Sequence, residues 1–161
     1  MAVPREVFPL AAVLTATFDL LMSGLVLTGM MVWFQLPVGW PWLWVPVLLF
    51  MTGALAMGIG MFLAALGTFS RDFLLARGFF MQLWLYVSPI IYPISSVPER
   101  WRGLYVMNPM VGILEGFRAV LVKGVAPNPD MLGWSLVGIM VAWIAGWPLY
   151  RYMSQYFADA L

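Results

Sequence analysis

The sequence predicts an all-α integral membrane protein with four transmembrane helices and a re-entrant pair of short helices before the last span. Two observations lead to this prediction. Hydrophobic residues make up 63% of the 161 residues and charged residues only 9%, whereas soluble domains carry about 25% charged residues. The apolar residues also form long runs, and about 20 such residues in a helix cross a bilayer.

The first two predicted spans are residues 10–34 and 43–66. Each is long enough to cross a hydrocarbon core of about 30 Å with some tilt. Residues 35–41 between them contain two prolines and a glycine, which favour a turn. Tryptophans gather there as they do at membrane interfaces; these are Trp33, Trp40, Trp42 and Trp44.

The third and fourth predicted spans are residues 73–92 and 131–150. The third is less regular, because Arg77 lies near its start and Pro89 near its end. An arginine at this depth can extend its side chain to the interface, and neighbouring groups can satisfy the carbonyl that a proline leaves free. Four spans place both termini on one side, but the basic residues divide equally and do not indicate which side.

Small residues recur at four-residue spacing in the second span, and again in the fourth. Such stripes let another helix approach closely. We expect the first stripe to be a packing face inside the protein. The first stripe is Ala56, Gly60 and Ala64, and the second is Gly138, Ala142 and Gly146.

Asp19 is the only acidic residue deep in a span. It lies about 13 Å past Leu10 if the segment is helical. Because an unpaired charge in a membrane is costly, the side chain should face the bundle interior or water. We expect Asp19 to pair during packing or dimerisation. The spans contain no histidine or second acid with which it could relay a proton.

The first of the two short helices is predicted over residues 98–106. The preceding residues fit a capping box, in which Ser96 accepts a hydrogen bond from the Glu99 N–H and Glu99 reaches back. Pro98 would then fall in the first turn, where its missing N–H costs little.

The second short helix is predicted over residues 109–122. Asn108 should be its N-cap and Pro109 its first residue, since both residue types are preferred there. Glu115 and Arg118 lie three residues apart, so they share a helix face and can pair.

Neither short helix can cross a bilayer alone. The apolar character of the second, with one charged pair, suggests a re-entrant element covered by protein or by a water-filled cavity. Two amphipathic helices resting on the membrane surface fit the same pattern equally well.

Several kinds of chemistry are excluded by residue type. Without cysteine or histidine, the chain has no disulfide, no thiol nucleophile, no zinc site and no histidine acid–base chemistry. No phosphate-binding GxxxxGK[ST] loop is present. The net charge of +1 gives no indication of a nucleic-acid partner.

Residues 82–124 resemble the permease subunits of ABC-2 type exporters of bacterial surface polysaccharides, such as O-antigen, capsule and teichoic acid. The resemblance rests on motifs found in order: Ser88-Pro89, Tyr92-Pro93, Pro98-Glu99-Arg100-Trp101, Asn108-Pro109 and Glu115-Gly116-Phe117-Arg118. Residues 4–13, 70–72 and 157–159 are also similar to the family, so the resemblance covers nearly the whole chain. Family members have six spans after an amphipathic helix, which implies that this chain lacks their N-terminal portion.

The resemblance implies a transporter rather than an enzyme. The permease would form a homodimer in the bacterial inner membrane, among membrane lipids, with both termini in the cytoplasm. A separate ABC subunit would bind ATP, so the chain would need no cofactor. The cargo would be a lipid-linked polysaccharide.

The resemblance also implies site residues. An outer gate would comprise Pro98, Glu99, Arg100, Trp101, Asn108, Pro109, Glu115 and Arg118. Contacts with the ATPase subunit would come from Arg5, Arg71 and Asp72.

Two further sets of side chains suit the cargo. Aromatic faces bind sugar rings through C–H groups, so a glycan path could be lined by Trp84, Tyr86, Tyr92 and Trp101. Core packing or an interfacial belt explains any one of them as well. Arginines bind pyrophosphate through charge-assisted hydrogen bonds, although solvated charge or the Glu115–Arg118 pair also explains Arg100, Arg102 and Arg118.

Two alternatives to transport remain. A membrane glycan or acyl transferase would need a nucleophile or paired acids, and the isolated Asp19 offers neither. A non-transporting remnant or assembly module would fit the shortened N-terminal portion.

Overall fold

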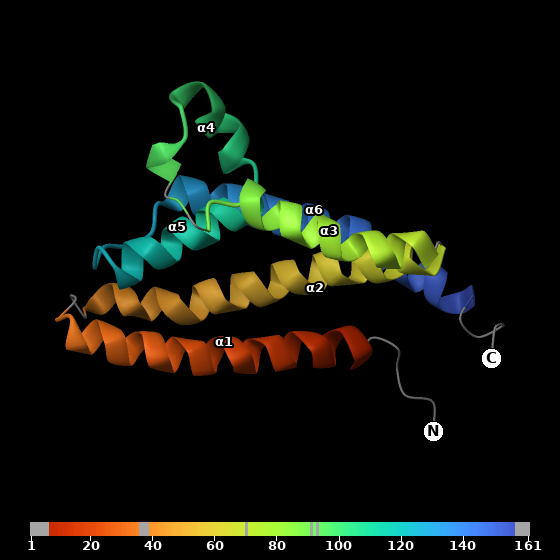
Figure 1. Ribbon diagram of the computed structural model, residues 1–161, viewed down its shortest axis with the longest axis horizontal. Coiled ribbons are helices and arrows are strands. Elements are labelled where there is room, and N and C mark those ends of the chain that lie inside the picture. Colours follow the sequence, from red (N-terminus) through yellow and green to blue (C-terminus); the bar gives the residue numbers. More distant parts are fainter. Residues whose placement is uncertain (1–6, 36–38, 70, 91, 93, 157–161) are drawn as a thin grey trace.

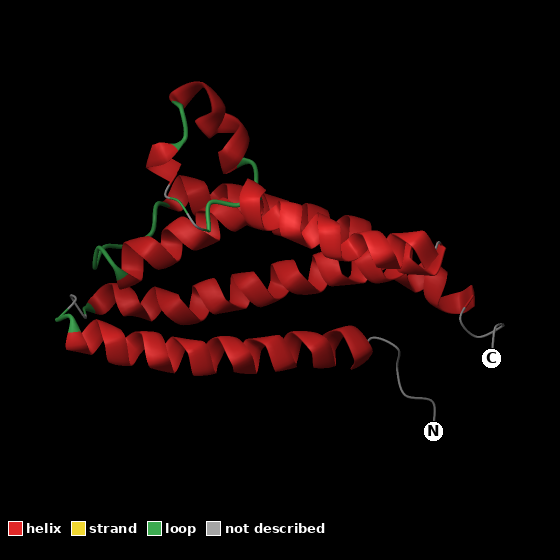
Figure 2. Cartoon of the chain, in the orientation of Figure 1, coloured by secondary structure: helices red, strands yellow, loops and turns green. Residues whose placement is uncertain are grey.

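The computed structural model describes residues 7–35, 39–69, 71–90, 92 and 94–156. These residues form helices and connections, with no strand among them, which confirms the predicted all-α class (Figures 1 and 2). The α-helices are α1 (Val7–Trp33), α2 (Val45–Phe69), α3 (Arg71–Val87), α4 (Glu99–Val106), α5 (Pro109–Leu121) and α6 (Pro129–Tyr156). Two short 3₁₀ helices are η1 (Trp40–Trp44) and η2 (Ile94–Ser96).

Three helical segments in the described part of the chain are long and apolar enough to cross a membrane. They are Leu10–Trp33, Trp40–Gly67 and Pro129–Met153. The pair α4 and α5, which is bent by 102°, would raise the number to four if it is taken as one broken span.

α3 is shorter than the interval 73–92 over which a span was expected. The helix has 17 residues and ends at Val87. Pro89 explains this end, because a proline disfavours helical geometry in the residue before it and lacks an N–H to continue the ladder. Ser88 and Pro89 are both buried in the turn that follows.

The core lies between α2, α5 and α6, while α1 lies at one edge beside α2 (Figure 1). Leucine, isoleucine, valine and methionine side chains from the three core helices interlock there. The buried members of this cluster are Leu48, Met51, Leu55, Ile113, Val120, Leu132 and Ile139. α5, the second of the two short helices, is therefore seated against α2 and α6.

Of the two small-residue stripes, only the one on α6 packs against other parts of the protein. The stripe on α6 is a packing surface: a Cβ at Gly138 would meet the Pro109 ring at 2.6 Å, and Ala142 lies against Gly58. The prediction that the α2 stripe packs inside the protein is wrong for this chain, because Ala56 is exposed and a Cβ at Gly60 would meet nothing within 4 Å. α2 instead presents Gly58, two residues from either, to α6.

The capping box predicted at α4 is also wrong. Ser96 belongs to η2, and α4 begins at Glu99 after Pro98, with no side-chain hydrogen bond at the cap. A box starting at Ser96 would require helical geometry at Val97, which the following proline disfavours. Val97 is buried instead.

Candidate functional site

A partly buried hydrogen bond joins the residue after α3 to the residue before α5. Asn108 donates from Nδ2 to the Ser88 hydroxyl at 3.1 Å. Its Oδ1 accepts from the backbone N–H of Met110 at 3.0 Å, which confirms Asn108 as the N-cap of α5. Ser88 is fully buried. The side chain of Asn108 therefore caps the N-terminus of α5 and also links it to Ser88, the residue after α3.

Glu115 and Arg118 form the predicted ion pair, with Nη1 and Oε1 2.7 Å apart. Their side chains are only 13% and 25% exposed. Both also bind backbone, which the sequence did not predict. Arg118 Nη2 donates to the carbonyl oxygens of Pro89 at 2.6 Å and Ile90 at 2.9 Å. Glu115 Oε1 accepts from the N–H of Ile94 at 3.1 Å.

These contacts satisfy backbone hydrogen-bonding groups in the connection between α3 and α4. Outside the short η2 turn, the described part of its backbone is not helical, so a helix ladder does not satisfy its carbonyls. Non-helical backbone at membrane depth is tolerated only where protein or water satisfies it. The Glu115–Arg118 pair does so from α5, and the ion pair and backbone contacts together offset the cost of burying two charges. Removing either partner would leave the other charge and the connection unsatisfied.

α5 has little freedom to shift sideways on α6. A Cβ at Gly112 would collide with the Met131 carbonyl and the Ser135 hydroxyl of α6. One at Gly116 would meet Leu48 of α2 at 2.8 Å. Close packing therefore holds α5 against both α2 and α6.

α4 projects from the side of the bundle (Figure 1). Arg102 holds the turn before it, donating to the carbonyls of Val97 at 2.9 Å and Ser95 at 3.0 Å. It also lies 3.6 Å from Glu99. Arg100 stacks over the ring of Trp101, with the guanidinium carbon 5.6 Å from the ring centroid. Of the three arginines considered for a pyrophosphate, Arg102 and Arg118 are thus bound to the protein itself.

Of the four aromatic residues predicted to line a glycan path, Tyr86 and Tyr92 are joined by a hydrogen bond. The Tyr92 hydroxyl donates to the Tyr86 carbonyl at 2.9 Å and shares a hydrogen bond of 3.0 Å with the Tyr105 hydroxyl. Trp84 on α3 and Trp101 on α4 are exposed. Tyr105 was not predicted as a site residue, because its link to Tyr92 joins residues 13 apart across an irregular connection.

The predicted contacts with an ATPase subunit are described only in part. Arg5 lies outside the described residues. Arg71 and Asp72 begin α3, but their side chains are not described. Asp19 lies in the middle of α1 and is exposed. No group of metal-ligating residues occurs in the described part of the chain.

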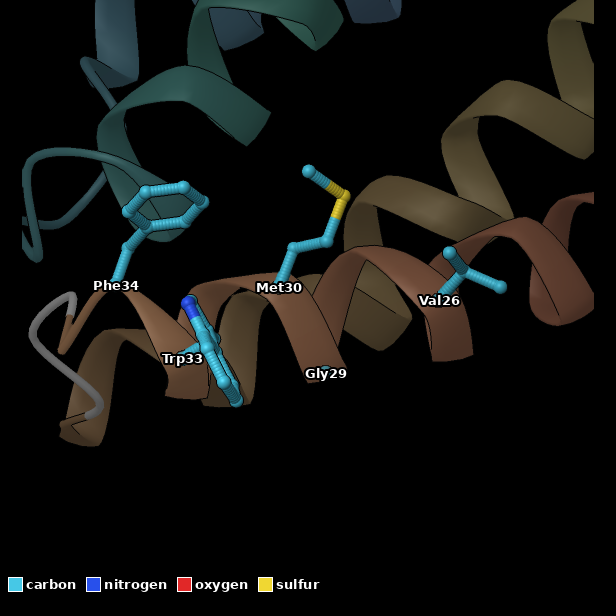
Figure 3. A pocket seen from close by; sticks show the side chains of 5 residues that line it. All are labelled: Val26, Gly29, Met30, Trp33 and Phe34. Carbon is cyan, nitrogen blue, oxygen red and sulfur yellow. The ribbon is translucent and has the colours of Figure 1, made fainter.

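A shallow hollow lies on α1 near its C-terminal end (Figure 3). Val26, Met30 and Phe34 follow one another along one side of the helix, with Trp33 beside them (Figure 3). Its lining is mainly apolar, and Gly29 completes it.

The sequence is similar to a known family of membrane transporters. The model of the family described as ABC-2 type transporter matches residues 2–122. The chain is similar to the O-antigen export system permease protein RfbA of Myxococcus xanthus, at 24% identity over 98% of this chain and 62% of the relative. It is also similar to the protein of that name from Klebsiella pneumoniae, at 23% identity over 98% of this chain and 61% of the relative. The chain thus spans about three fifths of these relatives, and no solved structure matches it.

Proposed function

The chain belongs to the ABC-2 type transporter family, and on that premise we propose that it is a permease subunit of an exporter of lipid-linked surface polysaccharide. The observation that carries the proposal is the similarity to O-antigen export permeases, which extends over 98% of the chain. The long apolar helices agree with a membrane subunit. The polysaccharide would cross the bacterial inner membrane outward.

In this proposal the energy comes from a separate ATP-binding subunit. The sequence has no GxxxxGK[ST] loop with which to cradle a nucleotide phosphate. The end of the molecule where α2 meets α3 would face the cytoplasm together with both termini, and Arg5, Arg71 and Asp72 would contact the ATPase there. A second copy of the permease would complete the translocation path.

The Glu115–Arg118 pair would control the outer gate. The pair joins α5, which is seated on α6, to the connection that leads to α4. If Arg118 released the carbonyls of Pro89 and Ile90, α4 could move without displacing α5. Pro98, Glu99, Arg100, Trp101, Asn108 and Pro109 belong to the same gate in this proposal. The exposed Trp84, Tyr86 and Trp101, together with Tyr92, would offer aromatic faces to the glycan.

Co-expression with the ATP-binding subunit of an O-antigen exporter tests the proposal. The two proteins should purify as a complex in detergent, and lipid-linked glycan should raise its ATPase rate. If the chain fails to bind that subunit, or if the glycan leaves the rate unchanged, the transport proposal is wrong. Failure to bind would favour a non-transporting assembly module.

The gate assignment needs its own variants. Arg118→Ala should impair export while the complex with the ATPase still forms. Lys123→Ala is the matched control, because Lys123 is an exposed basic residue that does not belong to the proposed gate. Normal export by Arg118→Ala would contradict the gate assignment and leave the transport proposal standing.

A further inference from the structure

Tyr105 attaches α4 to the end of α3 through Tyr92. The two hydroxyl oxygens lie 3.0 Å apart, and the Tyr92 hydroxyl donates to the backbone carbonyl of Tyr86, in the last turn of α3, at 2.9 Å. In the part of the chain that the structure describes, the other polar side-chain contacts of α4 are local ones made by Arg102. The Tyr105 hydroxyl is therefore the side-chain group through which α4 is hydrogen-bonded toward another helix.

The direction of each hydrogen bond follows from the groups involved. A carbonyl oxygen only accepts, so the single phenol proton of Tyr92 is committed to the carbonyl of Tyr86. Tyr105 must then be the donor to Tyr92. The three groups form a chain, in which Tyr105 donates to Tyr92 and Tyr92 donates to α3.

The Tyr86 carbonyl lacks the donor that a longer helix would give it. In a continuous α-helix the N–H of Ile90 would bond to this carbonyl. Ile90 instead donates to the Ser88 carbonyl at 2.7 Å, since the helix has ended. Tyr92 thus satisfies a free acceptor at the end of α3, and this bond holds the Tyr92 hydroxyl where Tyr105 reaches it.

Aromatic faces are exposed beside this chain of hydroxyls. Tyr86 and Trp101 are 57% and 50% exposed. Trp101 precedes Tyr105 by four residues, so the two lie on one face of α4. The rings of Tyr92 and Tyr105 meet edge to face, with their centroids 6.5 Å apart. A sugar ring stacked on one of the exposed faces would bring its own hydroxyl groups close to the two phenols.

We propose that Tyr105 is a positioning residue of the outer gate and that the cargo releases it. Its hydrogen bond to Tyr92 holds α4 at the end of α3, and a sugar hydroxyl replaces Tyr105 as the donor when the gate opens. The exchange costs little, because one neutral hydrogen bond takes the place of another. The inference rests on the proposed function and adds to it the step at which the cargo acts. Arg118 has a different part, since it holds the α3–α4 connection to α5.

Spin labels can measure the position of α4 without any transport. One label is placed at Leu104→Cys on α4 and the other at Val137→Cys on α6, both exposed positions in a chain without native cysteine. The full chain is studied in lipid nanodiscs and diluted with unlabelled chain, so that only distances within one chain are read. Tyr105→Phe should raise the fraction of molecules with α4 displaced by about fivefold, the change that about 1 kcal/mol of lost hydrogen bonding produces.

Tyr86→Phe is the matched control for the spin-label distances. It should leave them unchanged, because only the backbone carbonyl of Tyr86 takes part in the hydrogen-bond chain. Unchanged distances in Tyr105→Phe, or an equal change in Tyr86→Phe, would overturn the proposal.

Two tyrosine analogues at position 105 test the direction of the bond. 4-Aminophenylalanine keeps a donor at the same place on the ring and should restore the original distances. O-Methyltyrosine keeps the oxygen but has no proton to donate, so it should behave like Tyr105→Phe. Restoration by the methyl ether would overturn the assignment of Tyr105 as the donor.

The cargo step is tested in the complex with the ATP-binding subunit. Tyr105→Phe should lower the concentration of lipid-linked glycan that half-maximally stimulates the ATPase by about fivefold, because the glycan no longer has a tyrosine to displace. The maximal rate should stay the same. A lower maximal rate with an unshifted half-maximal concentration would mean a structural role alone and would overturn the proposal.

The proposed function fails by a different result. A complex of the unsubstituted chain that does not respond to glycan would contradict the proposed function and the cargo step together. The spin-label distances would still decide whether Tyr105 positions α4.

Discussion

Trp143 of α6 donates its indole N–H to the backbone carbonyl of Ala54 in α2, with the two atoms 2.8 Å apart. The residues are 89 positions apart in the sequence. Beside this contact α2 and α6 approach closely, because Gly58 faces both Ala142 and Gly146. The hydrogen bond and the close approach together fix the pairing of the two longest core helices.

Loss of the Trp143 hydrogen bond should destabilise the helix pair measurably. Trp143→Phe removes the indole N–H and leaves the Ala54 carbonyl without that donor. Interhelical hydrogen bonds in membranes contribute about 0.6 to 1.7 kcal/mol, so the midpoint of thermal unfolding in detergent should fall. Trp147→Phe is the control, since Trp147 stacks on Trp143 at 6.3 Å and is itself exposed. An equal effect of the two substitutions would contradict the assignment.

A methyl group at Gly146 should force α2 and α6 apart. In Gly146→Ala the added carbon would collide with the Gly58 carbonyl oxygen. Overpacking of this kind costs about 1 to 3 kcal/mol, which thermal unfolding of the purified protein would measure. Gly133→Ala on the same helix meets nothing within 4 Å and should be neutral or slightly stabilising. A harmless Gly146→Ala would show that the two helices are less tightly packed.

Ser88 and Asn108 should be energetically coupled. Ser88→Ala removes the link between α3 and α5 but keeps the Asn108 cap on Met110. Asn108→Ala removes both, so it should cost more, by about 1 kcal/mol for the lost cap. Contacting residues show coupling energies of about 0.5 to 3 kcal/mol, and a double-mutant cycle of unfolding free energies would measure this one. Strict additivity would contradict the link.

Exchanging the charges of Glu115 and Arg118 should not restore stability. Glutamate at 118 cannot donate to the carbonyls of Pro89 and Ile90, which Arg118 now binds. The swapped pair should therefore be as unstable as Arg118→Ala, whose loss of a buried partner costs about 3 to 5 kcal/mol. Protease cleavage of the α3–α4 connection in membrane vesicles should increase in both. Arg118→Lys should be intermediate, because an ammonium lacks the planar fork of a guanidinium.

Recovery of normal protease resistance by the swapped pair would mean that the ion pair alone holds the connection. The backbone contacts of Arg118 would then be incidental to stability.

Local features of the site were predictable from the sequence. The Asn108 cap and the Glu115–Arg118 pair depend on residues two and three positions apart on one helix, and short-range rules describe such contacts well. The failed capping box at Ser96 was also a local matter. The effect of Pro98 on Val97 was visible in the sequence and should have outweighed the motif.

The backbone partners of Glu115 and Arg118 were not predictable in this way. They lie 21 to 29 residues away, in an irregular connection. Their positions depend on where α3 ends and on how α5 is seated against α6 at Gly112. The spacing of residues within α3 or within α5 does not predict these contacts.

The sequence by itself determined that the chain is helical and lies in a membrane, because long apolar runs without charge have no other stable form. Only the tertiary structure decided which faces meet: Gly58 rather than Gly60 on α2, and the face of α1 away from Asp19. In water, an apolar stripe marks the buried side of a helix. In a bilayer, lipid is as apolar as leucine, so every face is apolar and packing is chosen by shape and a few polar contacts. Those contacts, such as Trp143 with Ala54, form only once the helices are assembled.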